Sequence, residues 1–301
     1  MSNSALPDLN VGTLFSQEGK VVVITGGGTG LGLMMATAFV QNGAKVVYIA
    51  SRKLKNLEGA AKMLNGIREG SAVPLEADLT TAKGCQALGD EIKQRESTVD
   101  VLINNSGVSW GSEMESTDEK KGWDRVFDVN VKSLFYLTVA LLPLLEKNTS
   151  PSSPASVINI SSIYGSLPFA NMPTLPVASM GAWSYLASKA AASHLTRTLS
   201  VKLKPRNVNV NALAPGFFPS NMTSTARDDS LARSHPAGLA GEAKDIAAPA
   251  LLLAGSGGAH LSGITITTDG GASLVPPHVF PKDIAKLHMP PERFERLLAK
   301  L

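Results

Sequence analysis

The pentad Tyr185-Leu186-Ala187-Ser188-Lys189 carries the residue types with the clearest chemical potential. A phenol and an ammonium group four positions apart share one face of a helix, so the positive charge can favour the phenolate and make Tyr185 a usable acid or base. The ordinary pKa of tyrosine is about 10, and lowering it to neutrality takes about 4 kcal/mol. Lys189, helped by the positive charge of an oxidised nicotinamide, is the candidate source. The spacing alone is a weak signal, because both residues are common on solvated helix faces.

A hydroxyl group lies where an α/β sheet would present it to a ligand. Ser162 closes the apolar run from Val157 to Ser161, and doubly wound sheets bind ligands at the carboxyl ends of their strands. At that position the hydroxyl can meet a carbonyl oxygen. Tyr164 is no rival for Tyr185 as the acid, because position 168 is Pro rather than Lys.

Short β-branched runs alternate with longer amphipathic stretches, which is the pattern of a parallel sheet covered by helices on both faces. Several runs are apolar throughout, as expected of strands buried on both sides. We predict a single-domain, doubly wound Rossmann fold of the α/β class with about seven parallel strands flanked by helices. The predicted strands are Lys20 to Thr25, Lys45 to Ala50, Val73 to Ala77, Val99 to Ile103, Ser156 to Ser161, Asn207 to Leu213 and Ile264 to Thr267. Helices are predicted to begin near Leu31, Leu54, Thr81, Gly122, Ala182 and Glu242.

A glycine-rich turn, from Thr25 to Gly32, follows the first predicted strand directly and opens the first long helix. Without Cβ atoms the glycines let the chain turn tightly and approach a pyrophosphate, whose charge then rests on the amides and the positive end of the helix. The strand before and the helix after make this a strong signal for a dinucleotide.

The residues after the second strand discriminate between the two nicotinamide cofactors. A carboxylate there would bind the ribose hydroxyls of NAD and repel a 2′-phosphate, but this chain reads Ala50-Ser51-Arg52-Lys53. Guanidinium and ammonium groups suit a phosphate monoester, and Ser51 can add a hydrogen bond. The residues therefore favour NADP(H), the alternative being an exposed basic loop.

The composition fits one globular domain with a full core. The chain has 301 residues, of which 44% are hydrophobic, which leaves little room for a second domain. The charge is nearly balanced at +3 and no basic run with interleaved aromatic residues is present, so we expect no nucleic-acid partner. No metal site is predicted, because the histidines are scattered and none pairs closely with a cysteine or carboxylate. They are His194, His235, His260, His278 and His288.

The cysteine content and the N-terminal residues indicate a cytoplasmic protein. Cys85 is the only cysteine, which excludes an internal disulfide and fits a reducing compartment. Residues 1–19 lack the basic start and continuous apolar core of a signal peptide, and no apolar run approaches the length of a membrane span. We therefore expect no membrane partner.

Several motifs together resemble a short-chain dehydrogenase/reductase of the single-domain type, over about residues 18–273. We accordingly expect an N-terminal arm over 1–17, a substrate loop at 216–241 and a C-terminal extension over 274–301. The last part of that extension, from Pro291, is predicted as a short amphipathic helix packed on its own subunit or a neighbour. The matching residues are the turn from Thr25 to Gly32, Asp78-Leu79, Asn104-Asn105-Ser106-Gly107, Asn130, Ser162, Tyr185 with Lys189, Pro215-Gly216 and Asp269-Gly270-Gly271.

The resemblance implies a role for each catalytic residue. Tyr185 would donate the proton, and Ser162 would polarise and orient the substrate carbonyl. Lys189 would lower the pKa of Tyr185 and hold the nicotinamide ribose, and Asn130 would anchor the water chain that resupplies the proton. The predicted cofactor-binding residues are Gly26, Thr29, Gly30, Leu31, Gly32, Ser51, Arg52, Lys53, Asp78, Leu79, Asn105, Ser106, Gly107, Lys132, Tyr185, Lys189, Pro215, Gly216, Phe218 and Ser220.

Three departures from the family pattern bear on the site. Ser106 stands where the family has alanine, and Ser220 replaces the more usual threonine while keeping the hydroxyl. The interval from Ser162 to Tyr185 is longer than the family usually shows, so the extra residues must bulge outward or the serine is misassigned. Ser161 is the alternative, although period-two alternation turns it toward the other face of the strand.

A finer similarity is to 3-oxoacyl-thioester reductases linked to rhamnolipid synthesis. It rests on Asn105 to Gly111 with its Trp110, Leu141 to Leu145, and Ala214 to Ser220. It implies a β-keto or otherwise activated ketone as substrate and leaves aromatic or polycyclic ketones of secondary metabolism open. The predicted pocket wall is apolar, although its members would equally suit the core. They are Phe169, Met172, Trp183, Phe217 and Met222.

We therefore predict an NADPH-dependent carbonyl reductase acting on a small-molecule ketone, with Tyr185 protonating the oxygen as hydride reaches the carbon. The same residues would serve the reverse reaction, alcohol oxidation with NADP⁺. A low-turnover nucleotide-binding scaffold or sensor is the alternative class, and the complete Ser-Tyr-Lys-Asn set argues against it. The resemblance also implies a homodimer or homotetramer paired through the helices at Gly122 to Glu146 and Ala182 to Lys204.

Overall fold

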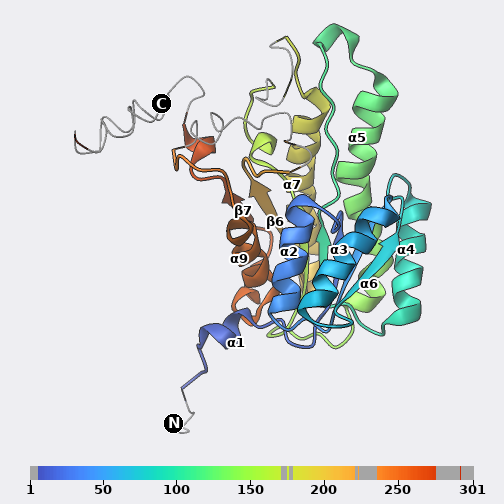
Figure 1. Ribbon diagram of the computed structural model, residues 1–301, viewed down its shortest axis with the longest axis vertical. Coiled ribbons are helices and arrows are strands. Elements are labelled where there is room, and N and C mark those ends of the chain that lie inside the picture. The colour runs from blue at the N-terminus through green and yellow to red at the C-terminus, as the bar shows by residue number, and fades with distance from the viewer. Residues whose placement is uncertain are drawn as a thin grey trace.

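A parallel sheet of seven strands forms the centre of the computed structural model, which describes residues 6–170, 175, 179–220, 223, 236–275 and 292 (Figure 1). The order across the sheet is β3-β2-β1-β4-β5-β6-β7. The chain reverses direction across the sheet between β1 and β4, and the crevice at such a switch point is where doubly wound folds bind ligands. The strands are β1 (Val21–Thr25), β2 (Val46–Ser51), β3 (Ala72–Glu76), β4 (Val101–Asn104), β5 (Ala155–Ile160), β6 (Val208–Pro215) and β7 (Thr265–Thr268).

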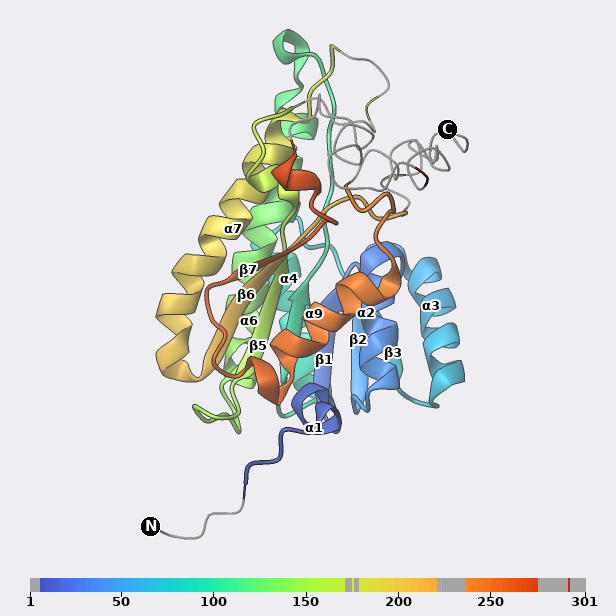
Figure 2. The ribbon, with the colours of Figure 1, turned by 90° about the vertical axis from the view of Figure 1, so that its left-hand side faces the viewer.

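Helices cover both faces of the sheet (Figure 2), which confirms the predicted fold class. One face carries α2 (Gly30–Gln41), α3 (Leu54–Ile67) and α9 (Ala243–Ala254). The other face carries α4 (Ala82–Arg95), α6 (Ser133–Leu145) and α7 (Trp183–Leu203). The shorter helices are α1 (Val11–Phe15), η1 (Met114–Ser116), η2 (Glu119–Asp124), α5 (Arg125–Phe127), η3 (Asp128–Lys132), η4 (Ile163–Gly165), η5 (Lys204–Arg206), η7 (Ser256–Gly258) and η8 (Ala272–Leu274).

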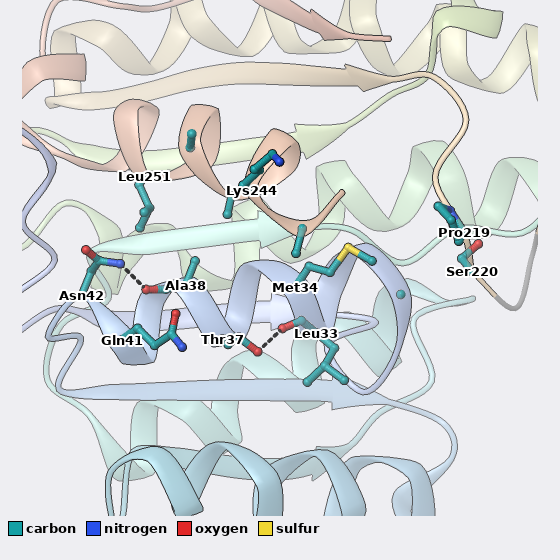
Figure 3. Close-up of a pocket in the computed structure, with 14 residues that line it drawn as sticks. Leu33, Met34, Thr37, Ala38, Gln41, Asn42, Pro219, Ser220, Lys244 and Leu251 are labelled. Carbon is teal, nitrogen blue, oxygen red and sulfur yellow. Dashed lines mark hydrogen bonds between the residues drawn. The ribbon is translucent and has the colours of Figure 1, made fainter. Parts of the chain in front are cut away.

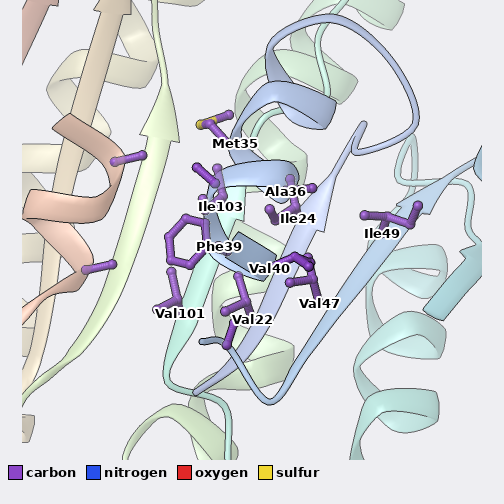
Figure 4. Close-up of a cluster of buried hydrophobic side chains, with 14 of the residues drawn as sticks. Val22, Ile24, Met35, Ala36, Phe39, Val40, Val47, Ile49, Val101 and Ile103 are labelled. Carbon is purple, nitrogen blue, oxygen red and sulfur yellow. The ribbon is translucent and has the colours of Figure 1, made fainter. Parts of the chain in front are cut away.

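Strand β1 is buried on both faces, and this is why successive residues in it are apolar. Val22 and Ile24 enter the core under α2 and α9 (Figure 4), whereas Val21 and Val23 belong to the core on the opposite face. All four are at most 2% exposed, and full burial of such a side chain stabilises the fold by about 1.5–3 kcal/mol. This double burial fixes the sheet edge from which the site is built.

One continuous helix runs from Glu119 to Leu145 through η2, α5, η3 and α6. Its η2 and η3 turns are π-helical, a geometry that is rare and often found at functional sites. By length and composition alone, this helix could cross a membrane. More than half of its apolar window is buried inside the protein, as in the core helix of a globular domain.

The predicted N-terminal arm is described from Leu6 and packs through α1 on α9 and η7. The Gln17 amide donates to the Leu251 carbonyl at 3.1 Å, and the Ser256 hydroxyl donates to the Thr13 carbonyl at 3.1 Å. Most of the predicted C-terminal extension, including the helix from Pro291, lies outside the described residues.

Candidate active site

The four predicted catalytic residues come from three different elements and meet at the carboxyl edge of the sheet. Tyr185 and Lys189 lie one turn apart on α7, Ser162 follows β5, and Asn130 lies in the π-helical turn η3. Their exposed fractions are 7%, 4%, 7% and 0% in that order. Tyr185 and Lys189 therefore do not lie on a solvated helix face, which was the other interpretation of their spacing.

Asn130 ties the loop after β4 to α7. Its amide nitrogen donates to the Val108 carbonyl at 2.9 Å and to the Ser188 hydroxyl at 3.0 Å, and its oxygen accepts from the Val108 amide at 2.9 Å. The Ser188 hydroxyl in turn donates to the Tyr185 carbonyl at 2.7 Å. Asn130 therefore fixes the elements on either side of the site.

Lys189 is held inside the site by the end of β5. Its ammonium group donates to the Ile160 carbonyl at 2.8 Å and lies 5.6 Å from the centre of the Tyr185 ring. Burial disfavours the charged form and lowers the pKa of Lys189 to about 8. One of the three ammonium protons is used by Ile160, which leaves donors for another oxygen.

The pKa of Tyr185 moves opposite to the sequence prediction. Burial raises the pKa of this phenol above its ordinary value, and a hydrogen bond with Ser162 opposes the change only in part. The expected lowering by Lys189 is therefore wrong for the protein's own groups. The physical reason is that burial removes water from the phenolate, and this desolvation is the largest effect on the group. A phenol in this state retains its proton at neutral pH.

Ser162, rather than Ser161, faces Tyr185. The Ser161 hydroxyl donates to the Lys189 carbonyl at 2.9 Å and pairs with the Ser193 hydroxyl at 2.6 Å. That places it against the body of α7, so the alternative assignment is wrong, and period-two alternation is the reason. The Ser162 hydroxyl accepts from the amide of Tyr164 at 3.2 Å, which fixes its orientation.

Gly165, which the sequence did not single out, and Tyr164, which was set aside as the acid, both lie against this arrangement. A Cβ at Gly165 would lie 2.8 Å from the backbone of Lys189, so η4 rests directly on α7 only because this residue is glycine. Tyr164 lies near enough to Tyr185 for the charge of one phenolate to oppose that of the other. Burial first, and then Tyr185, raise the pKa of Tyr164 to about 12.

The segment between Ser162 and Tyr185 is longer than in the family, and the structure describes it in part; we call residues 171–181 the excursion. The Ala182 amide donates to the Ala170 carbonyl at 2.9 Å, immediately before α7 begins. This bond joins the two ends of the excursion, so its length does not set the distance between Ser162 and Tyr185.

The glycine turn has the close approaches that its sequence predicts. Gly26 and Gly30 have φ of 67° and 53°, which non-glycine residues rarely adopt. A Cβ on Gly32 would overlap the Gly26 carbonyl, so the turn closes on the first residues of α2. The cradle fits a pyrophosphate on the N-terminal amides of α2.

Asn105, Ser106 and Thr25 join the glycine turn to the end of β4. The Thr25 hydroxyl accepts from the amides of Asn105 and Ser106, both at 2.9 Å, and the Asn105 side chain donates to the Thr25 carbonyl at 2.9 Å. Thr25 was expected only as the start of the turn, and its buried hydroxyl is the signal that sequence reasoning missed. The adjacent Gly107 lies close to Lys189 and Asn130, since a Cβ there would be 3.5 Å from a polar atom of each.

The basic residues after β2 are free to bind an anion. Arg52 and Lys53 are exposed, and no acidic side chain among the described residues forms an ion pair with either. The Ser51 hydroxyl accepts from the Lys53 amide at 3.4 Å. Two unpaired cations at the end of β2 suit the 2′-phosphate of NADP.

The side chains of several predicted cofactor residues have partners within the protein. The Lys132 ammonium pairs with Asp128 at 2.7 Å on the helix surface. Phe218 is 3% exposed and packs in the core, where its ring lies directly against Gly241. Leu79 is likewise buried, and Asp78 accepts from the Thr80 amide at 3.1 Å at the turn before α4. Of these residues, the side chains of Lys132, Phe218 and Leu79 are occupied by surface pairing or core packing.

The segment after β6 brings Ser220 back to the glycine turn. A Cβ on Gly30 would lie 3.3 Å from the Ser220 side chain, and Gly216 packs against Asp269 beyond β7. The Thr223 hydroxyl accepts from the Ser220 amide at 2.8 Å and donates to the Phe218 carbonyl at 2.8 Å. Thr223 holds this bend, and the sequence analysis did not single it out.

A groove of about 650 Å³ runs between α2 and α9 from Gly30 and Ser220 to Asn42 (Figure 3). Its lining is largely apolar, with Leu33, Met34 and Leu251 along its walls. It shares only its Gly30 and Ser220 end with the predicted cofactor site and includes none of the four catalytic residues. The groove is therefore a neighbour of the active site rather than the site itself.

The predicted pocket wall is described only in part. Phe169 is 43% exposed, and the Trp183 indole donates to the Ser112 carbonyl at 3.1 Å. Met172 and Met222 lie outside the described residues. Within the part of the chain that the structure describes, no group of His, Cys, Asp and Glu is placed to hold a metal ion.

Comparison with known proteins gives the site a family. Residues 20–231 match the family model described as short chain dehydrogenase. The rhamnolipids biosynthesis 3-oxoacyl-(acyl-carrier-protein) reductase of Pseudomonas aeruginosa is 37% identical over 267 residues, which is 86% of this chain and 98% of that protein. The short-chain dehydrogenase/reductase PhomF of Diaporthe leptostromiformis is 31% identical over 304 residues, covering 92% of this chain and 99% of its own.

A solved structure agrees with these sequence relatives. The Pseudomonas aeruginosa RhlG/NADP active-site complex superimposes with a TM-score of 0.78 at 35% identity, over 87% of this chain and 99% of that one. The chain belongs to the short-chain dehydrogenase family, as its turn, sheet and buried Ser-Tyr-Lys-Asn set predicted.

Proposed function

We propose that the protein is an NADPH-dependent carbonyl reductase that reduces the ketone of a 3-oxoacyl thioester. The observation that carries the proposal is the buried convergence of Ser162 and Tyr185 above Lys189, next to a glycine turn shaped for a dinucleotide. The relatives named 3-oxoacyl-(acyl-carrier-protein) reductase and the complex with NADP support the substrate class and the cofactor.

The hydroxyls of Ser162 and Tyr185 bind the ketone oxygen together in this proposal. Their shared hydrogen bond places the two hydroxyls side by side, which supports a shared acceptor oxygen. Tyr185 holds its proton at neutral pH, because burial raises its pKa, and can donate it as negative charge develops on the substrate oxygen. NADPH, when bound, supplies the hydride.

Lys189 and Asn130 position the groups that take part in this proton transfer. Lys189 is fixed by Ile160 and keeps donors for the nicotinamide ribose. Asn130 locks Val108 and Ser188, so the loop after β4 and the first turns of α7 cannot separate. Loss of either residue would loosen the geometry around Tyr185.

The experiment follows the absorbance of the reduced cofactor with NADPH and, separately, NADH, against ketones that include a 3-oxoacyl thioester. We expect oxidation of NADPH with the thioester, in preference to NADH. Oxidation with aromatic or polycyclic ketones alone would move the substrate to that class. NADPH binding without turnover of any ketone would favour the scaffold or sensor and overturn the proposal.

We also propose that the protein forms a homodimer or homotetramer through α6. Phe135, Tyr136 and Val139 are each 41–47% exposed on this helix, an unusual density of large apolar side chains for a solvated face. Light scattering at micromolar concentration should give at least the dimer mass, and Val139→Glu should lower it. A monomer mass for the unmodified chain would contradict the proposal.

A cytoplasmic location belongs to the same proposal. Cys85 is buried and forms no disulfide, and burial raises the pKa of its thiol to about 11. A free thiol of this kind is compatible with a reducing compartment. Fractionation of expressing cells should recover the activity in the soluble fraction. Recovery with membranes would contradict the location.

A further inference from the structure

Tyr164 is a second phenol beside Tyr185, and the proton transfer described above does not use it. It lies in η4, two residues after Ser162, and its backbone amide donates to the Ser162 hydroxyl at 3.2 Å. The same short helix rests on α7 at Gly165, where a Cβ would lie 2.8 Å from the Lys189 backbone. Tyr164 therefore belongs to the segment that holds Ser162 against the catalytic helix.

The Tyr164 side chain lies close to the reacting centre. A negative charge on Tyr185 raises the pKa of Tyr164, an effect that requires the two phenols to be near one another inside the protein. The side chains of Ser162 and Tyr185 share a hydrogen bond. Three hydroxyl groups, from Ser162, Tyr164 and Tyr185, therefore lie together beyond the carboxyl end of β5.

The Tyr164 hydroxyl is available as a donor. Tyr164 is half-buried, and none of the described residues forms a hydrogen bond with its phenol group. Burial first, and then Tyr185, raise its pKa to about 12, so the group keeps its proton at neutral pH. By contrast, Tyr48, whose pKa is also raised to about 12, donates to Glu96 at 3.1 Å. A partly buried donor without a partner inside the protein suits an acceptor oxygen on a ligand.

We propose that the Tyr164 hydroxyl donates a hydrogen bond to a second carbonyl of the substrate, next to the ketone that Ser162 and Tyr185 bind. A 3-oxoacyl thioester carries such a group, because a single methylene separates its thioester carbonyl from the ketone carbon. Tyr164 therefore selects 1,3-dicarbonyl substrates over simple ketones, since a simple ketone leaves this donor without an acceptor. The inference deepens the proposed function and rests on it for the ketone.

Two ligands that differ in one carbonyl test this contact. They are the 3-oxobutanoyl thioester and the 3-oxobutyl thioether of N-acetylcysteamine, which share the ketone and differ only in the oxygen at the carbon bonded to sulfur. Calorimetry with NADP⁺ bound measures their dissociation constants, because the oxidised cofactor has no hydride to transfer. Binding therefore reports on the contact independently of turnover.

Tyr164→Phe removes the hydroxyl and keeps both the ring and the backbone amide that holds Ser162. Tyr48→Phe is the matched control, since it removes a phenol hydroxyl that lies in β2 and donates to Glu96. Circular dichroism of both variants verifies that they are folded.

We expect the unmodified chain and Tyr48→Phe to bind the thioester about fivefold more tightly than the thioether, which is the size of effect that one hydrogen bond between neutral groups gives. Tyr164→Phe should bind the two ligands equally, because it loses affinity for the thioester alone. Equal weakening of both ligands by Tyr164→Phe, or an unchanged preference for the thioester, would overturn the contact. So would an unmodified chain that binds the two ligands equally.

Turnover with NADPH separates this inference from the proposed function. If the thioester is bound with a preference that depends on Tyr164 but is not reduced, the proposed function fails while the contact stands. If the thioester is reduced and Tyr164→Phe keeps the preference, the contact fails while the proposed function stands.

Discussion

At the scale of single residues, the site is governed by burial more than by pairing of charges. Sequence spacing predicted that Lys189 would lower the pKa of Tyr185, but desolvation raises the pKa of Tyr185 and lowers that of Lys189. The identity and convergence of the residues could be predicted from their types and spacing. The direction of the Tyr185 shift could not, because it depends on how completely the folded chain excludes water from both groups.

The lowered pKa of Lys189 makes stability depend on pH. This group has a pKa of about 8 in the folded chain and 10.5 ordinarily. The unfolded state therefore binds more protons between these values, and the contribution to stability rises with pH across that window. By pH 9.5 the gain relative to pH 7 should be about 2 kcal/mol from this group.

Urea unfolding of the unmodified chain and of Lys189→Met at both pH values isolates this contribution. Lys189→Met should lack the gain, so the free energy of unfolding of the unmodified chain minus that of Lys189→Met should be about 2 kcal/mol more positive at pH 9.5 than at pH 7. Parallel pH dependence in the two chains would show that Lys189 keeps an ordinary pKa when folded.

The unpaired cations after β2 predict the cofactor preference. Replacing Arg52 and Lys53 together by alanine removes charge-assisted hydrogen bonds to a 2′-phosphate, which are worth about 1.5–3 kcal/mol. The dissociation constant of NADPH should rise about tenfold or more, while that of NADH changes little. An equal change for the two cofactors, measured by fluorescence titration, would contradict the assignment.

At the scale of elements, the strands could be predicted from the sequence, but the irregular turns and loops could not. The predicted strands match β1 to β7 within two residues at each end, because doubly buried strands are apolar throughout. The π-helical turn that carries Asn130 and the closure of the excursion at Ala170 and Ala182 were not predicted. Both depend on hydrogen bonds between distant segments, which no local pattern records.

The contact of η4 with α7 is a prediction at this scale. Gly165→Ala would place a Cβ 2.8 Å from the Lys189 backbone, so η4 must move and carry Ser162 with it. We expect a loss of about 1–3 kcal/mol in stability together with a fall in kcat. Gly59→Ala is the control, since nothing lies within 4 Å of its Cβ in α3, and it should stabilise the helix by about 0.5–1 kcal/mol.

Chemical denaturation measures the stability of the two variants, and NADPH oxidation measures their kcat. If Gly165→Ala is as stable and active as the unmodified chain, the contact does not position Ser162.

At the scale of the whole molecule, one sheet edge collects residues that lie far apart in the sequence. The end of β1 supplies the glycine turn, the end of β2 the cations, the end of β5 the serine, and α7 the tyrosine and lysine. The order β3-β2-β1-β4-β5-β6-β7 brings these ends together. A parallel sheet has all its carboxyl ends on one side, so the fold itself assembles the site.

The most direct test of the reductase compares the unmodified chain with Tyr185→Phe in NADPH oxidation by a 3-oxoacyl thioester. The buried phenol with its raised pKa is the proton donor in this mechanism. Removal of its hydroxyl should therefore lower kcat at least about 100-fold while NADPH binding, followed by fluorescence, stays within about twofold of the unmodified chain. Turnover by Tyr185→Phe at the unmodified rate would contradict the assignment of the acid and, with it, the mechanism.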